Sequence, residues 1–209
     1  MTFAKRLAEA RRTAARWHAG QTYGHHPYTM HLDEVLAVAL QYEIEDEDIL
    51  LATRFHDAIE DVEGITPQTI VATTGNTRVA LLAWAVTNEE GKNRKVRAKK
   101  TYPKIAGIPG ATILKLCDRI ANTRNCWLEA ERMDANKRNR SKLGMYRSEY
   151  PGFRKALRRA EVEGPERLMW NELDRLFAWA PVVGEDRDYT LSMSDFQGTV
   201  PPILESLLD

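Results

Sequence analysis

The chain has 209 residues, and its 30 Lys and Arg balance 30 Asp and Glu to give a formal net charge of zero. This balance argues against a protein whose surface is built to bind nucleic acid or an anionic membrane. The longest apolar run, residues 79–86, is far shorter than the roughly 20 residues that cross a bilayer. Two cysteines and an N-terminus without an uncharged apolar stretch predict a reduced, soluble, cytoplasmic protein.

Helical periodicity runs through most of the sequence and predicts an all-α domain. The loop at residues 20–30, the basic segment at 91–104 and the turn near Pro109 interrupt it. In chain order, the expected helices cover residues 3–17, 31–42, 45–61, 66–75, 79–86, 111–133, 135–160 (with interruptions at Gly144 and at Pro151–Gly152) and 165–179. We expect residues 1–180 to form one domain. Residues 181–209 form an irregular tail of unknown role, in which residues 189–193 could hold a short strand pair.

Acids and metal-ligating side chains are concentrated in the sequence His-Asp-Ala-Ile-Glu-Asp at residues 56–61. On a helix of about 100° per residue, His56, Asp57, Glu60 and Asp61 would share one arc. So many ionisable groups on one helix arc in an apolar setting are costly unless something compensates their charge. A divalent metal provides that compensation, and imidazole and carboxylate are suitable ligands for it. The bland alternative is a surface His-Asp pair.

Two further places add candidate ligands. His31 closes the predicted loop at the start of a helix, and Asp118 and Asn122 share one face of the long helix expected at 111–133. Each motif is weak alone. Together with residues 56–61 they predict a metal site more specifically than any lone His-Asp pair does.

Four motifs carry a resemblance to a known family. They are Pro-Tyr-Thr-Met-His at 27–31, Ala-Thr-Arg-Phe-His-Asp-Ala-Ile-Glu-Asp at 52–61, Val-Thr at 86–87 and Leu-Lys-Leu-Cys-Asp-Arg-Ile-Ala-Asn at 114–122. In this order, over roughly residues 3–160, they resemble the HD-domain hydrolases of the RelA/SpoT alarmone family, specifically the stand-alone small alarmone hydrolases. The resemblance implies an HD-domain helical bundle that binds a nucleotide.

The resemblance also implies roles for individual residues. The four metal ligands, which usually hold Mn²⁺, match His31, His56, Asp57 and Asp118. Glu60 and Asp61 match the acidic pair that orients or activates water and handles protons, and Asn122 matches the residue near the substrate ribose. The family reaction removes pyrophosphate from the 3′ position of guanosine tetra- or pentaphosphate and leaves GDP or GTP. A metal fits this chemistry because it lowers the pKa of its bound water and polarises the phosphoryl group.

Cations for the substrate phosphates are available at residues 92–100. A charge run is usually a solvated helix face. This run lies between the Val-Thr motif and the motif at 114–122, where the family also has a basic segment. We therefore predict that one or more of Arg94, Lys95 and Lys99 contacts substrate phosphate. A second basic run, residues 137–140 with Lys142, could be surface, a phosphate contact or a partner site, and we expect the surface first.

The sequence departs from the family near Gln21, where an arginine that stacks on the guanine base usually follows shortly afterwards. Tyr23 or His25 could stack in its place, because both present a flat ring. We expect His18 on a helix surface and the tryptophans, Trp84 included, in the core.

Two alternatives stay open. The same metal site could cleave another nucleotide, such as a deoxynucleoside monophosphate or NADPH, and the missing arginine favours this reading. The chain could also be a catalytically silent module that binds a nucleotide or a protein, although none of the ligands or acids is lost. By resemblance, the hydrolase could act as an antitoxin to a separate alarmone synthetase, and a homo-oligomer is left open.

Overall fold

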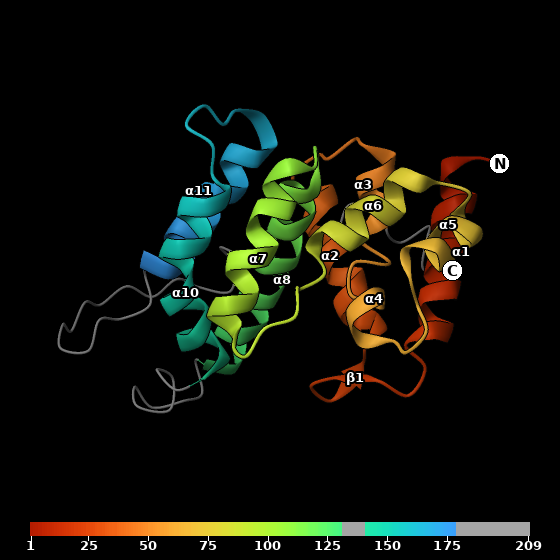
Figure 1. The fold of residues 1–209 in the computed structure, drawn as a ribbon, viewed down its shortest axis with the longest axis horizontal. Helices are drawn as coiled ribbons and strands as arrows, with labels where there is room; N and C mark the ends of the chain where they lie inside the picture. The colour runs from red at the N-terminus through yellow and green to blue at the C-terminus, as the bar shows by residue number, and fades with distance from the viewer. Residues whose placement is uncertain (131–140, 179–209) are drawn as a thin grey trace.

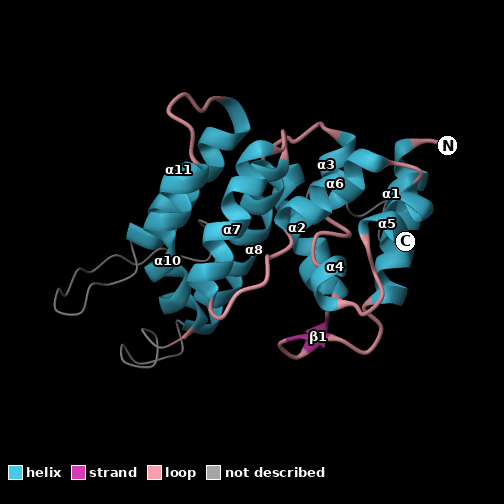
Figure 2. Cartoon of the chain, viewed as in Figure 1, coloured by secondary structure: helices cyan, strands magenta, loops and turns pink. Residues whose placement is uncertain are grey.

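Helices make up most of the chain that the computed structural model describes, residues 1–130 and 141–178, so the all-α prediction is confirmed (Figures 1 and 2). The helices are α1 (Phe3–Trp17), α2 (Thr29–Gln41), α3 (Glu47–Ala52), α4 (Ala58–Asp61), α5 (Pro67–Thr74), α6 (Thr77–Val86), α7 (Arg94–Gly107), α8 (Ala111–Ala130), α10 (Lys142–Leu157) and α11 (Gly164–Ala178). The predicted tail at 181–209, with its strand pair at 189–193, lies outside the described residues.

Helix α8 runs through the middle of the bundle and packs against helices from both ends of the sequence. It contacts α2, α3 and α6 on one side and α10 and α11 on the other, with α7 alongside (Figure 1). Leu114, Leu116 and Ile120 are fully buried although they point to different sides of α8, and they share one core with Val35 and Leu36 of α2. The central helix therefore places residues near Asp118 between the two halves of the bundle.

Local sequence signals account for several helix ends. Thr66 caps α5 through a reciprocal pair of bonds with Thr69, Pro67 occupies the first turn, and Gly75 ends the helix in the left-handed conformation with φ 64°. These are the preferred residues at such positions, because the cap satisfies free N–H groups and glycine carries no Cβ. The prediction for residues 66–75 is confirmed.

The helix expected at 45–61 is divided, and the prediction that residues 56–61 share one helical arc is wrong. Helix α3 ends at Ala52, residues 53–57 form turns, and α4 begins only at Ala58. Side chains compete with the helical ladder at this point: the Thr53 hydroxyl donates to the carbonyl of Leu50, and His56 Nδ1 lies 2.8 Å from the carbonyl of Thr53. His56 and Asp57 therefore lie in a turn before α4 rather than on a shared helix face.

Two other segments are more regular than predicted. The basic segment forms most of α7, and α10 continues through Gly144, Pro151 and Gly152, where interruptions were expected. Packing accounts for the continuity of α10, because Phe153 and Tyr150 are buried on either side of Pro151 and Gly152.

The predicted loop at 20–30 contains a small hairpin that lies under α4 (Figure 2). Strands β1 (Thr22–Tyr23) and β2 (His26–Pro27) pair in antiparallel register, with Tyr23 opposite His26. Gly24 turns the chain with φ 61°, a conformation that glycine adopts without a steric penalty.

Two single-residue expectations are wrong. His18 is buried rather than on the surface, because its ring stacks on Tyr28 at 4.6 Å and its Nδ1 lies 2.7 Å from Gln21. Trp84 is 39% exposed rather than in the core, since it points from α6 toward Lys104, whose ammonium lies 4.4 Å from the ring. Within residues 1–130 and 141–178, the helices are too short or too polar to cross a membrane.

Candidate metal centre and its cavity

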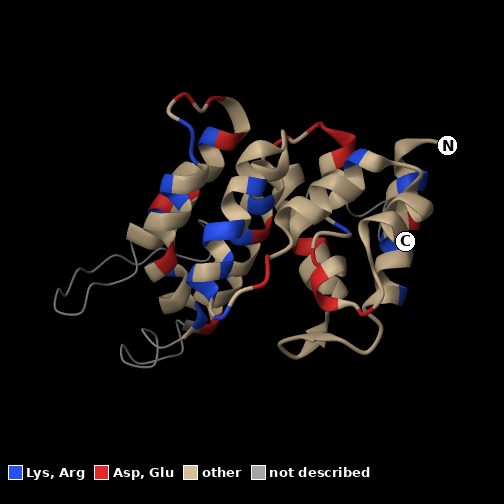
Figure 3. Cartoon of the chain, in the orientation of Figure 1, with Lys and Arg blue, Asp and Glu red and all other residues tan. Residues whose placement is uncertain are grey.

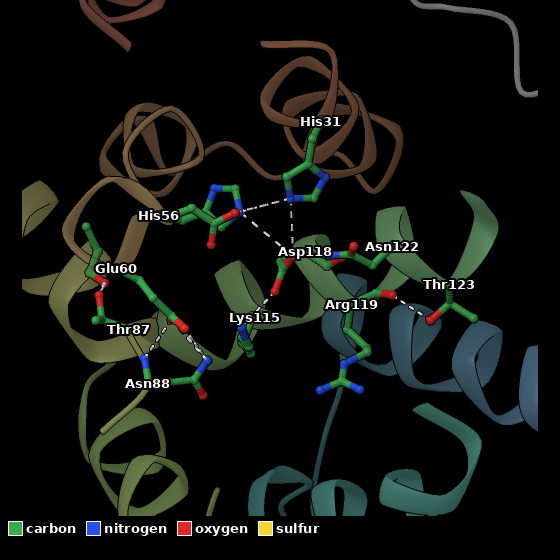
Figure 4. A network of polar contacts seen from close by, with 12 residues as sticks. His31, His56, Glu60, Thr87, Asn88, Lys115, Asp118, Arg119, Asn122 and Thr123 are labelled. Carbon is green, nitrogen blue, oxygen red and sulfur yellow. Dashed lines mark hydrogen bonds and ion pairs between the residues drawn. The ribbon is translucent and has the colours of Figure 1, made fainter. Parts of the chain in front are cut away.

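Three donor groups from distant parts of the sequence converge at the centre of the bundle (Figure 4). His31 comes from the first turn of α2, His56 from the turn before α4, and Asp118 from the middle of α8. The two imidazole Nε2 atoms lie 3.3 Å apart, and Asp118 Oδ1 lies 3.5 Å from His31 Nε2 and 3.8 Å from His56 Nε2. All three residues are buried.

Asp57 completes the set from the other side of the histidines. Its Oδ2 lies 3.0 Å from His56 Nε2 and 3.4 Å from His31 Nε2. The four residues expected as ligands are thus brought together, two imidazole nitrogens and two carboxylates around one point. Such a mixed nitrogen and oxygen set suits a divalent cation of intermediate softness.

Hydrogen bonds orient these donors toward the shared point. His56 Nδ1 donates to the carbonyl of Thr53 at 2.8 Å, which leaves the lone pair on Nε2 facing His31. His31 Nδ1 is buried without a hydrogen-bond partner among the described residues. On the carboxylate side, Lys115 donates to Asp118 Oδ2 at 2.7 Å, and the Asn122 amide donates to Asp118 Oδ1. Asp118 is therefore held with Oδ1 toward the histidines.

The charges of the site are coupled. Burial alone would raise the pKa of Asp118, but Lys115 and the two histidines hold it well below its ordinary value. Burial would likewise lower the pKa of His31, yet Asp118 and Asp57 raise it to about 9. The two carboxylates are thus ionised, and they favour a positive charge on His31. The buried group of His31, His56 and Asp118 fits a divalent metal, because a cation would satisfy both carboxylates and both Nε2 lone pairs.

Tyr28 links the candidate ligands to Asp61. Its hydroxyl oxygen lies 2.7 Å from Asp57 Oδ2 and 2.9 Å from Asp61 Oδ2. One hydroxyl hydrogen can be donated to one of these carboxylates at a time. Burial and the nearby charge of Asp57 raise the pKa of Asp61. The motif at 27–31 did not predict a role for Tyr28. Its spacing of three residues from His31 is the signal that could have placed the two side chains at one site.

Glu60, the other member of the acidic pair, is oriented by Asn88. Its carboxylate accepts from the backbone N–H of Asn88 at 3.1 Å and from the Asn88 side-chain amide at 3.0 Å (Figure 4). Asn88 directly follows the Val-Thr motif at 86–87. Both Glu60 and Asp61 are exposed and line the same cavity as the candidate ligands.

That cavity has a volume of about 720 Å³. Of the expected substrate-binding residues, Tyr23, His25, Arg94 and Asn122 line it, whereas Lys95 and Lys99 are exposed on α7 and are not among its lining residues. The helical period explains the difference, since Arg97, Ala98 and Thr101 recur at three, four and seven residues after Arg94 and also line the cavity.

Several basic residues of the cavity wall were missed by the sequence reasoning. Lys142 was expected on the surface, but its ammonium lies 5.2 Å from the ring of Tyr23. The sequence leaves Arg119 open between a catalytic role and a pairing with an acid such as Glu60; in the structure its guanidinium lies 3.6 Å from Glu149. The basic lining residues are Arg94, Arg97, Lys115, Arg119 and Lys142. Figure 3 shows basic residues gathered on α7 and acidic residues on α4.

Tyr23 connects the hairpin to two residues of the site, His31 and Asn122. Its ring stacks on His31 with the centroids 4.7 Å apart, and its hydroxyl donates to Asn122 Oδ1 at 2.9 Å. Asn122 in turn donates to Asp118. One aromatic side chain of β1 therefore braces residues of α2 and α8 at the metal centre.

No family model matches the sequence, and no curated protein matches it either. Among solved structures, the chain is similar to one described as a metazoan ortholog of SpoT that hydrolyzes ppGpp and plays a role in starvation responses. The two chains are 22% identical and superpose with a TM-score of 0.64, over 81% of this chain and 94% of the other. The likeness shows that the HD-domain helical bundle expected from the motifs is the fold of this chain.

Proposed function

We propose that this chain is an Mn²⁺-dependent hydrolase that removes the 3′-pyrophosphate of guanosine tetra- or pentaphosphate and releases GDP or GTP. The observation that carries the proposal is the convergence of His31, His56 and Asp118, with Asp57 beside both histidines, next to a cavity with a basic lining. The fold supports it, because the similar solved structure is described as hydrolyzing ppGpp.

In this proposal His31, His56, Asp57 and Asp118 hold the metal, which when bound lowers the pKa of a water molecule and polarises the phosphoryl group. His56 is kept in the ligating tautomer by its bond to Thr53. The remaining lone pairs of Asp118 are satisfied by Lys115 and Asn122, which keeps the carboxylate ionised and fixed.

Glu60 and Asp61 differ in their surroundings, and this favours different roles. The Asn88 amides hold the Glu60 carboxylate in one orientation, which suits a base that orients or deprotonates water. Asp61 has a raised pKa and shares the hydroxyl of Tyr28 with Asp57, which suits a group that carries a proton toward the leaving oxygen.

The basic lining provides the remaining electrostatic stabilisation. Phosphoryl transfer spreads negative charge over several oxygens, and fixed cations stabilise that charge. Lys115 lies against Asp118, while Arg94, Arg97, Arg119 and Lys142 extend the positive wall away from the ligands. A nucleotide with phosphates at two positions fits a cavity with a metal site and a separate set of cations.

One observation favours a second candidate substrate. Tyr23, expected to stack on the base, already stacks on His31. Base recognition would then fall to His25, the other expected stacking residue, and a weaker hold on guanine would let the same site cleave a deoxynucleoside monophosphate or NADPH instead.

The proposal extends to the setting of the enzyme. Residues 1–180 would carry the hydrolase domain, and the protein would act in the cytoplasm on an alarmone that a separate synthetase chain produces. Under this proposal the synthetase is a functional partner that needs no physical contact with the hydrolase.

The experiment is product analysis of purified protein with guanosine tetraphosphate and Mn²⁺, beside the isosteric variant Asp118→Asn. We expect GDP and pyrophosphate from the wild type and a loss of at least about 100-fold in the variant, since the metal loses a charged ligand. The exposed variant Glu63→Gln, outside the cavity lining, should retain wild-type activity. NADPH and deoxynucleoside monophosphates run in parallel. Cleavage of one of these alone would replace the alarmone by the second candidate, and no cleavage of any would refute a hydrolase.

A further inference from the structure

Glu149 of α10 lies between two of the arginines in the cavity wall. Arg94 of α7 contacts it through both arms of the guanidinium, Nε to Oε1 at 2.6 Å and Nη2 to Oε2 at 3.0 Å. Arg119 of α8 approaches the same carboxylate with Nη1 3.6 Å from Oε2. Glu149 itself lines the cavity. The Glu149 carboxylate therefore occupies the paired N–H donors of Arg94 and also lies beside the guanidinium of Arg119.

The two arginines are held very differently. The Arg119 side chain is 7% exposed, and its guanidinium lies 4.3 Å from the ring of Tyr146 and 4.9 Å from that of Phe153. Figure 4 shows this side chain extending away from the two histidines. The Arg94 side chain is 46% exposed at the start of α7. Arg119 is thus a fixed cation, whereas Arg94 has solvent on one side and room to exchange partners.

A guanidinium binds a carboxylate and a phosphate with the same pair of parallel N–H groups. The two-armed contact with Glu149 therefore uses the donors that Arg94 would offer to a phosphate in the cavity. Arg94 and Arg119 also keep this carboxylate ionised, because they lower the pKa of Glu149 even though burial alone would raise it. A phosphate that reaches Arg94 must compete with the ionised Glu149 carboxylate.

We propose that Glu149 is a specificity-determining residue that competes with ligand phosphate for Arg94 and so limits how much negative charge the basic end of the cavity accepts. Binding of a phosphate at this end exchanges one ion pair of Arg94 for another and leaves the Glu149 carboxylate beside Arg119. The consequence for substrate choice rests on the proposed function, but the competition itself does not.

The test measures inorganic pyrophosphate binding by calorimetry to metal-free protein. Glu149→Gln keeps the size of the side chain and removes its charge, and we expect pyrophosphate to bind at least about threefold more tightly. The matched control is Glu129→Gln, which removes the same charge from the lining of the same cavity on α8. A general change in potential would affect both variants equally. Equal effects, or no gain in Glu149→Gln, would overturn the proposal.

A double variant identifies the contact. If Glu149 acts by occupying Arg94, the gain from Glu149→Gln should be lost when Arg94→Gln is already present. A gain that persists without Arg94 would contradict the competition. Should Glu149→Gln fail to fold, Glu149→Asp keeps the charge beside Arg119 and shortens the reach to Arg94. A smaller gain in the same direction is then expected, and no gain would overturn the proposal.

Kinetics with a nucleotide substrate then separates this proposal from the proposed function. Because Glu149 contacts the basic end of the cavity rather than the candidate ligands, Glu149→Gln should lower KM and leave kcat within about twofold. The decrease should be larger for guanosine pentaphosphate than for the tetraphosphate. A protein that hydrolyses neither nucleotide but shows the pyrophosphate result would refute the proposed function and leave the role of Glu149 intact.

Discussion

The Nε2 atoms of His31 and His56 lie 3.3 Å apart, although the residues are separated by 25 positions in the sequence. Two neutral imidazoles could share one N–H···N hydrogen bond at this distance. Asp57 and Asp118 on either side add to it, since they favour a positive charge at this point. The geometry is that of a site whose stability depends on a cation or a proton.

We therefore expect Mn²⁺ to stabilise the folded protein. A ligand that binds only the native state at 100 times its Kd adds about 2.7 kcal/mol to the free energy of unfolding. Thermal melting with and without Mn²⁺ measures this, and His56→Gln should abolish the shift. His25→Gln, a cavity histidine outside the four donors, should keep it. A shift that survives in His56→Gln would place the metal elsewhere.

Tyr28→Phe should separate catalysis from stability. The ring would keep its stacking on His18, but Asp57 and Asp61 would lose their shared hydroxyl. We expect kcat to fall about 10- to 100-fold, the range of general acid–base contributions, at a stability cost of about 1 kcal/mol.

Tyr150→Phe is the matched control. Its hydroxyl also donates to a carboxylate, that of Asp174 at 2.6 Å, and Tyr150 is not among the cavity-lining residues. It should lose similar stability and no activity. Equal kinetic effects of the two variants would show that Tyr28 is only structural.

The motifs predicted the residues of the candidate centre better than they predicted its geometry. The family resemblance implied His31, His56, Asp57 and Asp118 as ligands, and these four side chains lie close together in the structure. The turn at 53–57 could not be anticipated, since it depends on hydrogen bonds of Thr53 and His56 with nearby carbonyls.

The cavity lining was harder still to predict. The cavity is lined by Arg97 and not by Lys95 because of the way α7 packs against α8 and α10. Likewise, the sequence places Lys142 in a charge run, and only the fold brings it over Tyr23. Long-range packing, which no local pattern encodes, decides both cases.

The face of α7 can be tested with a matched pair of charge deletions on residues two positions apart. Arg97 lines the cavity, whereas Lys95 is exposed and is not among the lining residues. Arg97→Gln should therefore raise KM for a phosphorylated substrate about 10-fold, the effect of losing a charged hydrogen bond of about 1.4 kcal/mol. Lys95→Gln should leave KM unchanged. The reverse order in steady-state kinetics would mean that α7 presents its other face to the ligand.

The pH dependence of stability can be tested far from the cavity, at the start of α3. Asp46 caps this helix and accepts two hydrogen bonds from Arg78, and the bond to Arg78 lowers its pKa below the ordinary value. A carboxyl group whose pKa is lower in the folded state stabilises the protein fully above its unfolded pKa, about 3.9, and loses that contribution as pH falls through the folded value.

Asp46→Asn keeps a good helix cap and removes the charge. Because the ion pair is partly exposed, we expect the variant to be less stable by only about 0.5–1 kcal/mol at pH 7. This difference should shrink below about pH 4, where the wild-type carboxylate becomes protonated. Urea unfolding of both proteins at pH 7 and pH 3 measures it. A difference that stays constant between the two pH values would mean that the carboxylate charge is not what stabilises this helix end.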